Sequence, residues 1–159
     1  DMTEISSWLG YPNTPTYSER EDRYLELENQ FTQEAAMENP GQNLVFDTTG
    51  SVVHLSPKTQ GILKANCLIV HIDIGDDKLE EMVAKFFSDP KPVSWCGHFS
   101  QAPGESETEA LTRCYPKLLE WRLAHYRELA HINIPVHELF DTSGPETLEI
   151  ISDRLKTQT

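Results

Sequence analysis

Basic residues are scarce in this chain. Lys and Arg together number 13 against 26 Asp and Glu in 159 residues, so the formal net charge is −13 at pH 7. Negative charge in this excess repels the phosphate backbone of nucleic acids and the surface of anionic membranes. We therefore expect neither nucleic acid nor a membrane as a partner. The oligomeric state stays open.

The sequence also lacks a disulfide framework and a long apolar run. Its three cysteines, Cys67, Cys96 and Cys114, are odd in number and form no C-x-x-C pair, which is typical of a reducing compartment. No apolar stretch approaches the ~20 residues that cross a bilayer, and no signal of the charged-then-apolar kind precedes the first expected helix. These features predict a soluble, cytoplasmic protein.

A third absence concerns nucleotide binding. None of the eight glycines is followed by lysine, so the sequence has no G-x-x-x-x-G-K-[ST] loop, which holds nucleotide phosphates through backbone N–H groups and one lysine. The sequence starts with Asp1 rather than methionine. Two interpretations follow: the sequence is a fragment of a longer protein, or the protein does not transfer phosphate in the usual way.

Apolar periodicity predicts helices and strands in alternation. Capping boxes are expected at Ser18 with Glu21 and at Ser106 with Glu109. N-caps are expected at Ser56, directly before Pro57 at the first helical position, and at Asp76. Pro116 is a candidate site for a helix kink. The expected helices cover residues 18–39, 56–65, 76–86, 106–130 and 145–155, and the expected strands cover 44–46, 67–72 and 132–136.

This alternation predicts one α/β domain over residues 1–159. Parallel strands need crossover helices, so we expect a three-layer parallel sheet with helices on both faces. Residues 88–106 are rich in Pro, Gly and Ser and should form a long lid-like loop. Ligands of such sheets bind at the carboxyl ends of the strands, which places residues 47–51, 73–76 and 137–144 at the expected site.

Several motifs occur in an order that is similar to one known family. Asp1-Met2-Thr3 is similar to the family motif D-x-D, and residues 24–28 (YLELE) are similar to F-R-x-x-E. Thr49-Gly50-Ser51 lies where the family has G-G-G, and residues 89–93 (DPKPV) are similar to R-P-L-L. Residues 120–130 are similar to E-R-x-x-x-Y-x-x-x-A. The order resembles shikimate kinase and related P-loop small-molecule kinases. The resemblance is loose but runs over nearly the whole chain.

The resemblance implies a role for each matching residue, with ATP and Mg as cofactors. Arg122 and Lys91 would stabilise the transferring phosphoryl group as the catalytic residues, and Asp1 would lie near magnesium. The substrate would contact Thr3, Thr49, Gly50, Ser51 and Arg122, and the nucleotide would contact Ser143, Gly144 and Pro145. The resemblance also implies a central strand and P-loop ahead of Asp1.

Two departures from the family pattern affect the substrate. Leu25 replaces the arginine that grips the carboxylate of shikimate, and Thr3 replaces the second acid; neither can supply the planar fork or the carboxylate that shikimate requires. We therefore expect a phosphotransferase for a small hydroxyl-bearing substrate other than shikimate. A non-catalytic, kinase-derived module that binds a ligand or protein is the alternative, and an unrelated α/β domain is a third.

Each candidate residue also has a plain structural interpretation. Arg122 could form a solvated ion pair with Glu120 or Glu128, the turn at 49–51 could bond its own backbone, and Lys91 could be an ordinary exposed lysine. Asp73, Asp76 and Asp77 fit caps better than a metal cluster. The combination of Cys96, His98 and Cys114 has no recognised zinc spacing. The apolar residues of the loop, with Trp95 among them, could bind a ligand or pack the loop on the domain.

Overall fold

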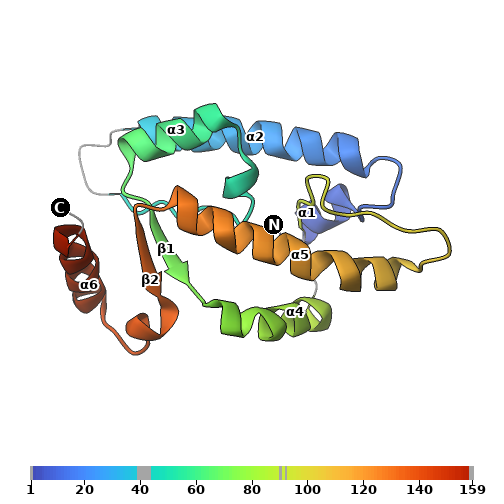
Figure 1. The fold of residues 1–159 in the computed structure, drawn as a ribbon. Helices are drawn as coiled ribbons and strands as arrows, with labels where there is room; N and C mark the ends of the chain where they lie inside the picture. Colours follow the sequence, from blue (N-terminus) through green and yellow to red (C-terminus); the bar gives the residue numbers. More distant parts are fainter. Residues whose placement is uncertain (1, 39–43, 90, 92, 158–159) are drawn as a thin grey trace.

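Figure 1 shows the fold in a computed structural model, which describes residues 2–38, 44–89, 91 and 93–157. Helices dominate it: α1 (Met2–Leu9), α2 (Tyr17–Met37), α3 (Pro57–Asn66), α4 (Leu79–Ser88), α5 (Glu107–Leu129) and α6 (Gly144–Thr157). The strands are β1 (Val70–Asp73) and β2 (Ile132–Pro135), and the short 3-10 helices are η1 (Val52–His54), η2 (Asp76–Lys78) and η3 (Val136–Leu139).

The two strands form a parallel pair, in which Val70 lies opposite Ile132 and Asp73 opposite Pro135. Helix α5 lies along one face of this pair, where the ring of Tyr126 is 5.5 Å from that of His71. Helix α6 packs on β2. The strands expected at 67–72 and 132–136 are therefore present, with the first beginning three residues later than expected.

The strand expected at 44–46 is not formed. Residues 44–49 have no regular secondary structure, and the side chain of Val45 is 93% exposed. A strand exists only where a neighbour supplies partners for its N–H and C=O groups, and no described residue pairs with this run. The sheet in the described part of the chain thus has two strands rather than three, and Ile72 of β1 is 55% exposed.

Two apolar clusters form the core, and α5 contributes to both. One centres on η1 and α3 and the other on the contact of α1, α2 and the loop before α5. From α5, Leu129 belongs to the first, and Cys114 and Leu118 belong to the second. Because α5 links the clusters and also contacts β1, it is the element on which the rest of the fold is assembled.

The helix termini confirm two of the expected caps. Ser106 Oγ accepts the N–H of Glu109 at 3.3 Å and Glu109 Oε2 accepts the N–H of Ser106 at 2.8 Å, which is a complete capping box. Ser56 Oγ accepts the N–H of Thr59 at 3.2 Å, directly before Pro57 at the first position of α3. Pro116 lies inside a helix that continues on both sides of it.

Two expected caps are wrong because their carboxylates bind elsewhere. Helix α2 begins at Tyr17 after Thr16, which makes no side-chain cap, and Glu21 accepts hydrogen bonds from a distant loop instead. Asp76 lies in η2 and pairs with Arg127 at 2.9 Å. In both places a tertiary partner outcompetes the local backbone.

Glu21 fixes the lid-like loop onto α2. This carboxylate is only 8% exposed, and its Oε1 accepts hydrogen bonds from the Tyr17 hydroxyl at 2.7 Å, from the Cys96 N–H at 3.0 Å and from the Trp95 N–H. The Trp95 side chain is 3% exposed, with its ring 5.3 Å from that of Phe99. Trp95 therefore packs the loop on the domain and is not a free ligand-stacking surface.

Replacing Glu21 should destabilise the protein strongly. In Glu21→Ala the Cys96 N–H loses its acceptor, while the Trp95 N–H keeps only the Tyr17 hydroxyl and that hydroxyl keeps only the Val93 carbonyl. An unsatisfied buried group of this kind costs about 1–3 kcal/mol, and the loss of the charged acceptor weakens the other two. We expect the free energy of unfolding in urea to fall by about 2–4 kcal/mol. Glu19→Ala, at an exposed position of the same helix, is the control and should change it by less than about 0.5 kcal/mol. Equal effects of the two substitutions would contradict this role.

Candidate functional site

Thr49, Gly50 and Ser51 form a turn that α2 and α5 hold from two sides. From α2, the Glu28 carboxylate accepts the Thr49 hydroxyl on Oε1 and the Ser51 hydroxyl on Oε2, the latter at 2.6 Å. From α5, the Tyr126 hydroxyl donates to the carbonyl of Gly50. A Cβ added at Gly50 would lie 3.3 Å from the Tyr126 oxygen, so this close approach favours a residue without a side chain.

Arg122 lies next to this turn. Its Nη1 would be 3.6 Å from a Cβ at Gly50, its Nε donates to Nε2 of His54 at 3.1 Å, and its Nη2 donates to the carbonyl of Ser94 at 2.7 Å. Arg122 and the 49–51 turn, which were both predicted to contact the substrate, therefore lie next to each other. Within the described residues no carboxylate lies within 4.0 Å of the Arg122 guanidinium, so the alternative ion pair with Glu120 or Glu128 is not formed.

Aromatic rings surround the acceptor of Arg122. The ring of His54 stacks on that of Trp121 at 4.7 Å with an interplanar angle of 12°, and His125 stacks on Trp121 at 3.7 Å. Burial lowers the pKa of His54 to about 3, with further lowering from the charge of Arg122. The imidazole is therefore neutral at physiological pH, which it must be in order to accept the Arg122 N–H.

Positive potential extends from this arginine to its other neighbours. Burial lowers the pKa of His98, and Arg122 lowers it further. Burial raises the pKa of Tyr126, while the nearby Arg122 opposes that rise because it favours a phenolate. The site is thus a half-buried cation whose direct hydrogen-bond acceptors are neutral, with the Glu28 carboxylate on the far side of the 49–51 turn's hydroxyls.

The other predicted site residues do not join this cluster. Lys91 is exposed and pairs with Asp89 at 2.8 Å. Ser143 caps α6, where its Oγ and N–H both donate to Glu146, and Gly144 and Pro145 follow it in the first turn. Thr3 lies in α1, but its side chain is outside the described part. Asp1, the predicted magnesium-associated acid, also lies outside the described residues.

Metal-ligand clusters are absent from the part of the chain that the structure describes. Asp73 is engaged by Arg127, whose Nε lies 2.7 Å from its Oδ2, and this hydrogen bond lowers the pKa of Asp73. Cys67, Cys96 and Cys114 are free thiols. Burial raises the pKa of Cys96 to about 12, so it is protonated and a poor ligand or nucleophile.

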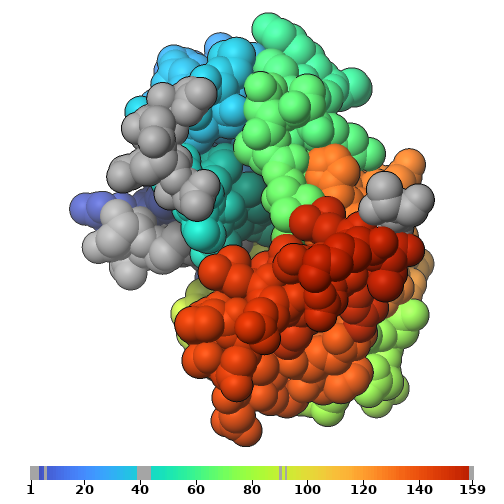
Figure 2. All heavy atoms as spheres, turned by 90° about the vertical axis from the view of Figure 1, so that its left-hand side faces the viewer, coloured from blue at the N-terminus to red at the C-terminus, as the bar shows by residue number. Residues whose placement is uncertain are grey.

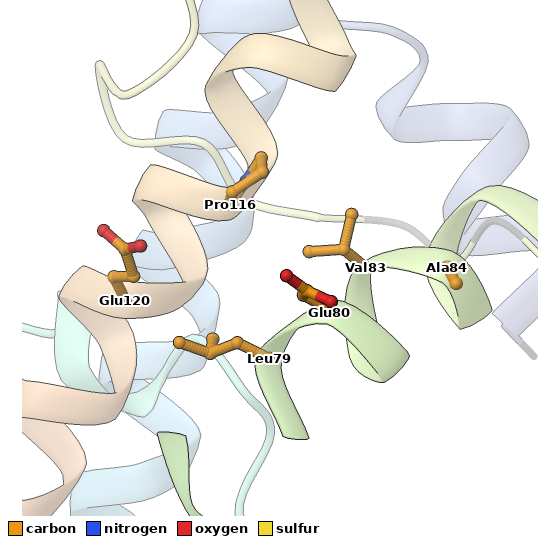
Figure 3. Close-up of a pocket in the computed structure, with 6 residues that line it drawn as sticks. All are labelled: Leu79, Glu80, Val83, Ala84, Pro116 and Glu120. Atoms are coloured by element: carbon orange, nitrogen blue, oxygen red, sulfur yellow. The ribbon is translucent and has the colours of Figure 1, made fainter. Parts of the chain in front are cut away.

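A separate cavity of about 310 Å³ lies between α4 and α5. Figure 3 shows its lining, in which Val83 projects from α4 toward Pro116 of α5, Leu79 projects toward α5 near Glu120, and Glu80 lies between Leu79 and Val83. Glu120 and Arg122 are about 200° apart around the helix, so this cavity opens on a different side of α5 from the turn at Gly50. None of the predicted site residues lines it.

Three groups at the site were not predicted as such: the Glu28 carboxylate, the His54 imidazole and the Ser94 carbonyl. Glu28 matches the glutamate of the F-R-x-x-E pattern, which was a usable signal. His54 sits in the apolar run Val52-Val53-His54-Leu55, where its only signal is a polar residue among buried ones. A backbone carbonyl such as that of Ser94 carries no sequence signal.

The depressed pKa of His54 predicts a pH effect on stability. An unfolded histidine has a pKa of about 6.5, so between pH 6.5 and 3 the unfolded chain binds a proton that the folded site does not. The contribution of neutral His54 is therefore complete above pH 6.5 and decreases as the pH falls toward 3. We expect the unfolding free energy of His54→Phe to fall less than that of the native protein between pH 7 and 4. The exposed His137→Phe is the control, and parallel pH profiles for native protein and His54→Phe would contradict the assignment.

No family model, curated protein or solved structure matches this chain. Within the described residues no helix combines the length and apolar character that crossing a membrane requires.

Proposed function

We propose that this chain binds the phosphoryl acceptor of a small-molecule phosphotransferase that resembles shikimate kinase, with Arg122 holding an anionic group of the substrate. The observation that carries this proposal is a half-buried guanidinium with no carboxylate partner among the described residues. Taking a charge out of water is costly unless a counter-charge approaches it. The planar fork of N–H donors on an arginine is also well suited to binding anionic groups.

The residues around Arg122 favour a hydroxyl-bearing substrate. Thr49 and Ser51 flank Gly50, which lies next to the guanidinium, and Glu28 accepts hydrogen bonds from both hydroxyls. A substrate hydroxyl could exchange with one of these donors at little cost, because the hydrogen bond lost is replaced by an equivalent one. Leu25 packs against the apolar cluster around η1 and has no group that could bind a substrate carboxylate. This supports a substrate other than shikimate.

The kinase architecture also predicts a further parallel strand beside β1. The exposed Ile72 of β1 and the exposed apolar residues at 44–46 support this prediction, since parallel sheets are normally covered on both faces. In Figure 2 the teal residues after position 44 lie next to the green residues that lead into β1, with a recessed surface between them. A strand placed there would pair with β1 on the edge that β2 leaves free.

ATP and magnesium are the cofactors of this proposal, with phosphoryl transfer relying on positioning and on charge neutralisation. Arg122 and Lys91 would supply the protein cations, Asp1 the acid near magnesium, and residues 143–145 the nucleotide contacts. The phosphate-binding loop would come from outside these 159 residues. The free thiols of all three cysteines fit a reducing, cytoplasmic location.

A non-catalytic binding module is the second candidate. It is favoured by the pairing of Lys91 with Asp89, which engages the predicted lid cation with a carboxylate. In this case the Arg122 site would bind its anion without phosphoryl transfer. Native mass spectrometry after incubation with Mg-ATP distinguishes the kinase from the binding module. Retained nucleotide supports the kinase. Binding of phosphate without binding of nucleotide supports the module.

The Arg122 site predicts binding of inorganic phosphate that one substitution removes. Arg122→Gln deletes the cation, and charge-assisted hydrogen bonds contribute roughly 1.5–3 kcal/mol, so Kd should rise by about 10- to 100-fold. The measurement is calorimetric titration with phosphate at low ionic strength.

Arg113→Gln is the matched control. Arg113 lies on the same helix and loses the same charge, but it is exposed and pairs with Glu105. We expect its Kd for phosphate to stay within about threefold of the native value, because exposed charges act weakly at a distance. Equal effects of Arg113→Gln and Arg122→Gln would mean that phosphate binding depends only on the net charge of the protein, which would overturn the proposed site.

A further inference from the structure

Only part of the Arg122 guanidinium is occupied by the protein. Nε donates to His54 and Nη2 donates to the carbonyl of Ser94, which uses one edge of the planar group. Nη1 is directed at the Gly50 turn, 3.6 Å from the position of a Cβ there. A guanidinium has five N–H donors in a fixed fork, so holding one edge determines where the remaining donors point.

The acceptors on the occupied edge are both neutral. A carboxylate at this place would orient the guanidinium equally well, but it would cancel the positive charge that an anion needs. A neutral imidazole and a carbonyl fix the direction and leave the charge intact. The two acceptors thus orient the Arg122 guanidinium without neutralising its charge.

His54 is itself held rigidly. It ends η1, whose Val52 and Val53 are buried in the core cluster, and its ring stacks on Trp121, one residue before Arg122 on α5. The imidazole cannot turn away without losing this stacking. His54 and Arg122 are therefore fixed with respect to each other by the packing of η1 on α5.

We propose that His54 is a positioning residue for Arg122: its Nε2 and the Ser94 carbonyl hold the guanidinium through neutral acceptors, so that Nη1 faces the Gly50 turn with no described carboxylate within 4.0 Å. This inference rests on the proposed function of Arg122 as the anion-binding group. His54 does not touch the anion. It sets the direction and the net charge of the group that does.

Three substitutions at one position separate the roles of His54. His54→Gln keeps a neutral acceptor but loses the aromatic stacking. His54→Phe keeps an aromatic ring on Trp121 but loses the acceptor. His54→Glu keeps an acceptor for the Arg122 N–H but adds the negative charge that the native site avoids.

The phosphate affinity of the three variants should fall in a fixed order. His54→Gln should stay within about threefold of native, His54→Phe should weaken binding about tenfold through loss of orientation, and His54→Glu should weaken it most, by about 100-fold or more. His125→Phe is the matched control, because His125 stacks on the other side of Trp121 and has no hydrogen bond to Arg122. It should bind phosphate like the native protein.

A second measurement does not depend on phosphate. In the ligand-free protein the Nε–H resonance of Arg122, assigned by its loss in Arg122→Gln, should be protected from solvent exchange in native protein and in His54→Glu, and should exchange rapidly in His54→Phe. Unchanged exchange in His54→Phe would overturn the positioning role. Native-like phosphate binding by His54→Glu would overturn the charge requirement.

The two readouts also distinguish this inference from the proposed function. If the native protein binds no phosphate, the proposed anion site fails, and the exchange measurement still decides whether His54 orients Arg122. If native protein binds phosphate and His54→Phe binds it equally, the anion site stands and the positioning role fails. Circular dichroism of each variant establishes that it is folded before either readout is compared.

Discussion

The Arg122 guanidinium joins three segments that are far apart in the sequence. From α5 it reaches His54 at the end of η1 and the carbonyl of Ser94 in the loop before α5, and it lies against the turn at Gly50. A charge in this half-buried position is tolerated only because neutral acceptors solvate it. The geometry of the site therefore depends on how well these three segments are held against α5.

The loop that supplies Ser94 is itself fixed by charges of both signs. Its Ser94 carbonyl accepts from Arg122, while the next two N–H groups donate to Glu21 on α2. Consecutive backbone groups of an irregular segment are thus satisfied by a cation on one helix and an anion on another. Since buried backbone groups need partners, the loop places Trp95 in the core and completes the Arg122 site at the same time.

Acidity and function are compatible in this chain because charge is distributed unevenly. The net charge of −13 repels anions at long range, yet near the site burial, reinforced by the positive charge of Arg122, lowers the pKa values of His54 and His98. At distances of a few ångströms in a partly desolvated site, a local cation outweighs distant exposed carboxylates that solvent and salt screen. An anion site in an acidic protein is therefore physically consistent.

Local sequence signals predicted α2 to α6 but not α1 (Met2–Leu9), whose residues were matched instead to a strand-end motif. The Ser106 and Glu109 box, the Ser56-Pro57 start and the strand at Ile132 depend on neighbours within a few residues, so the sequence carries them directly. The same kind of signal failed at Glu21 and Asp76, because partners 75 and 51 positions away along the chain offered those carboxylates better hydrogen bonds. The expected strand at 44–46 failed for a related reason, since a strand requires a neighbour that no local pattern supplies.

The sequence alone determined the acidic character and the helical periodicity, and its motif order assigned Arg122 and the 49–51 turn to one predicted substrate site without fixing any distance between them. Only the tertiary structure decided that Glu28 holds the turn, that Ser94 offers a carbonyl and that His54 accepts from Arg122 as a neutral ring. Hydrogen-bond partners and desolvation arise when segments far apart in the chain pack together. They have no counterpart in the order of residues along the chain.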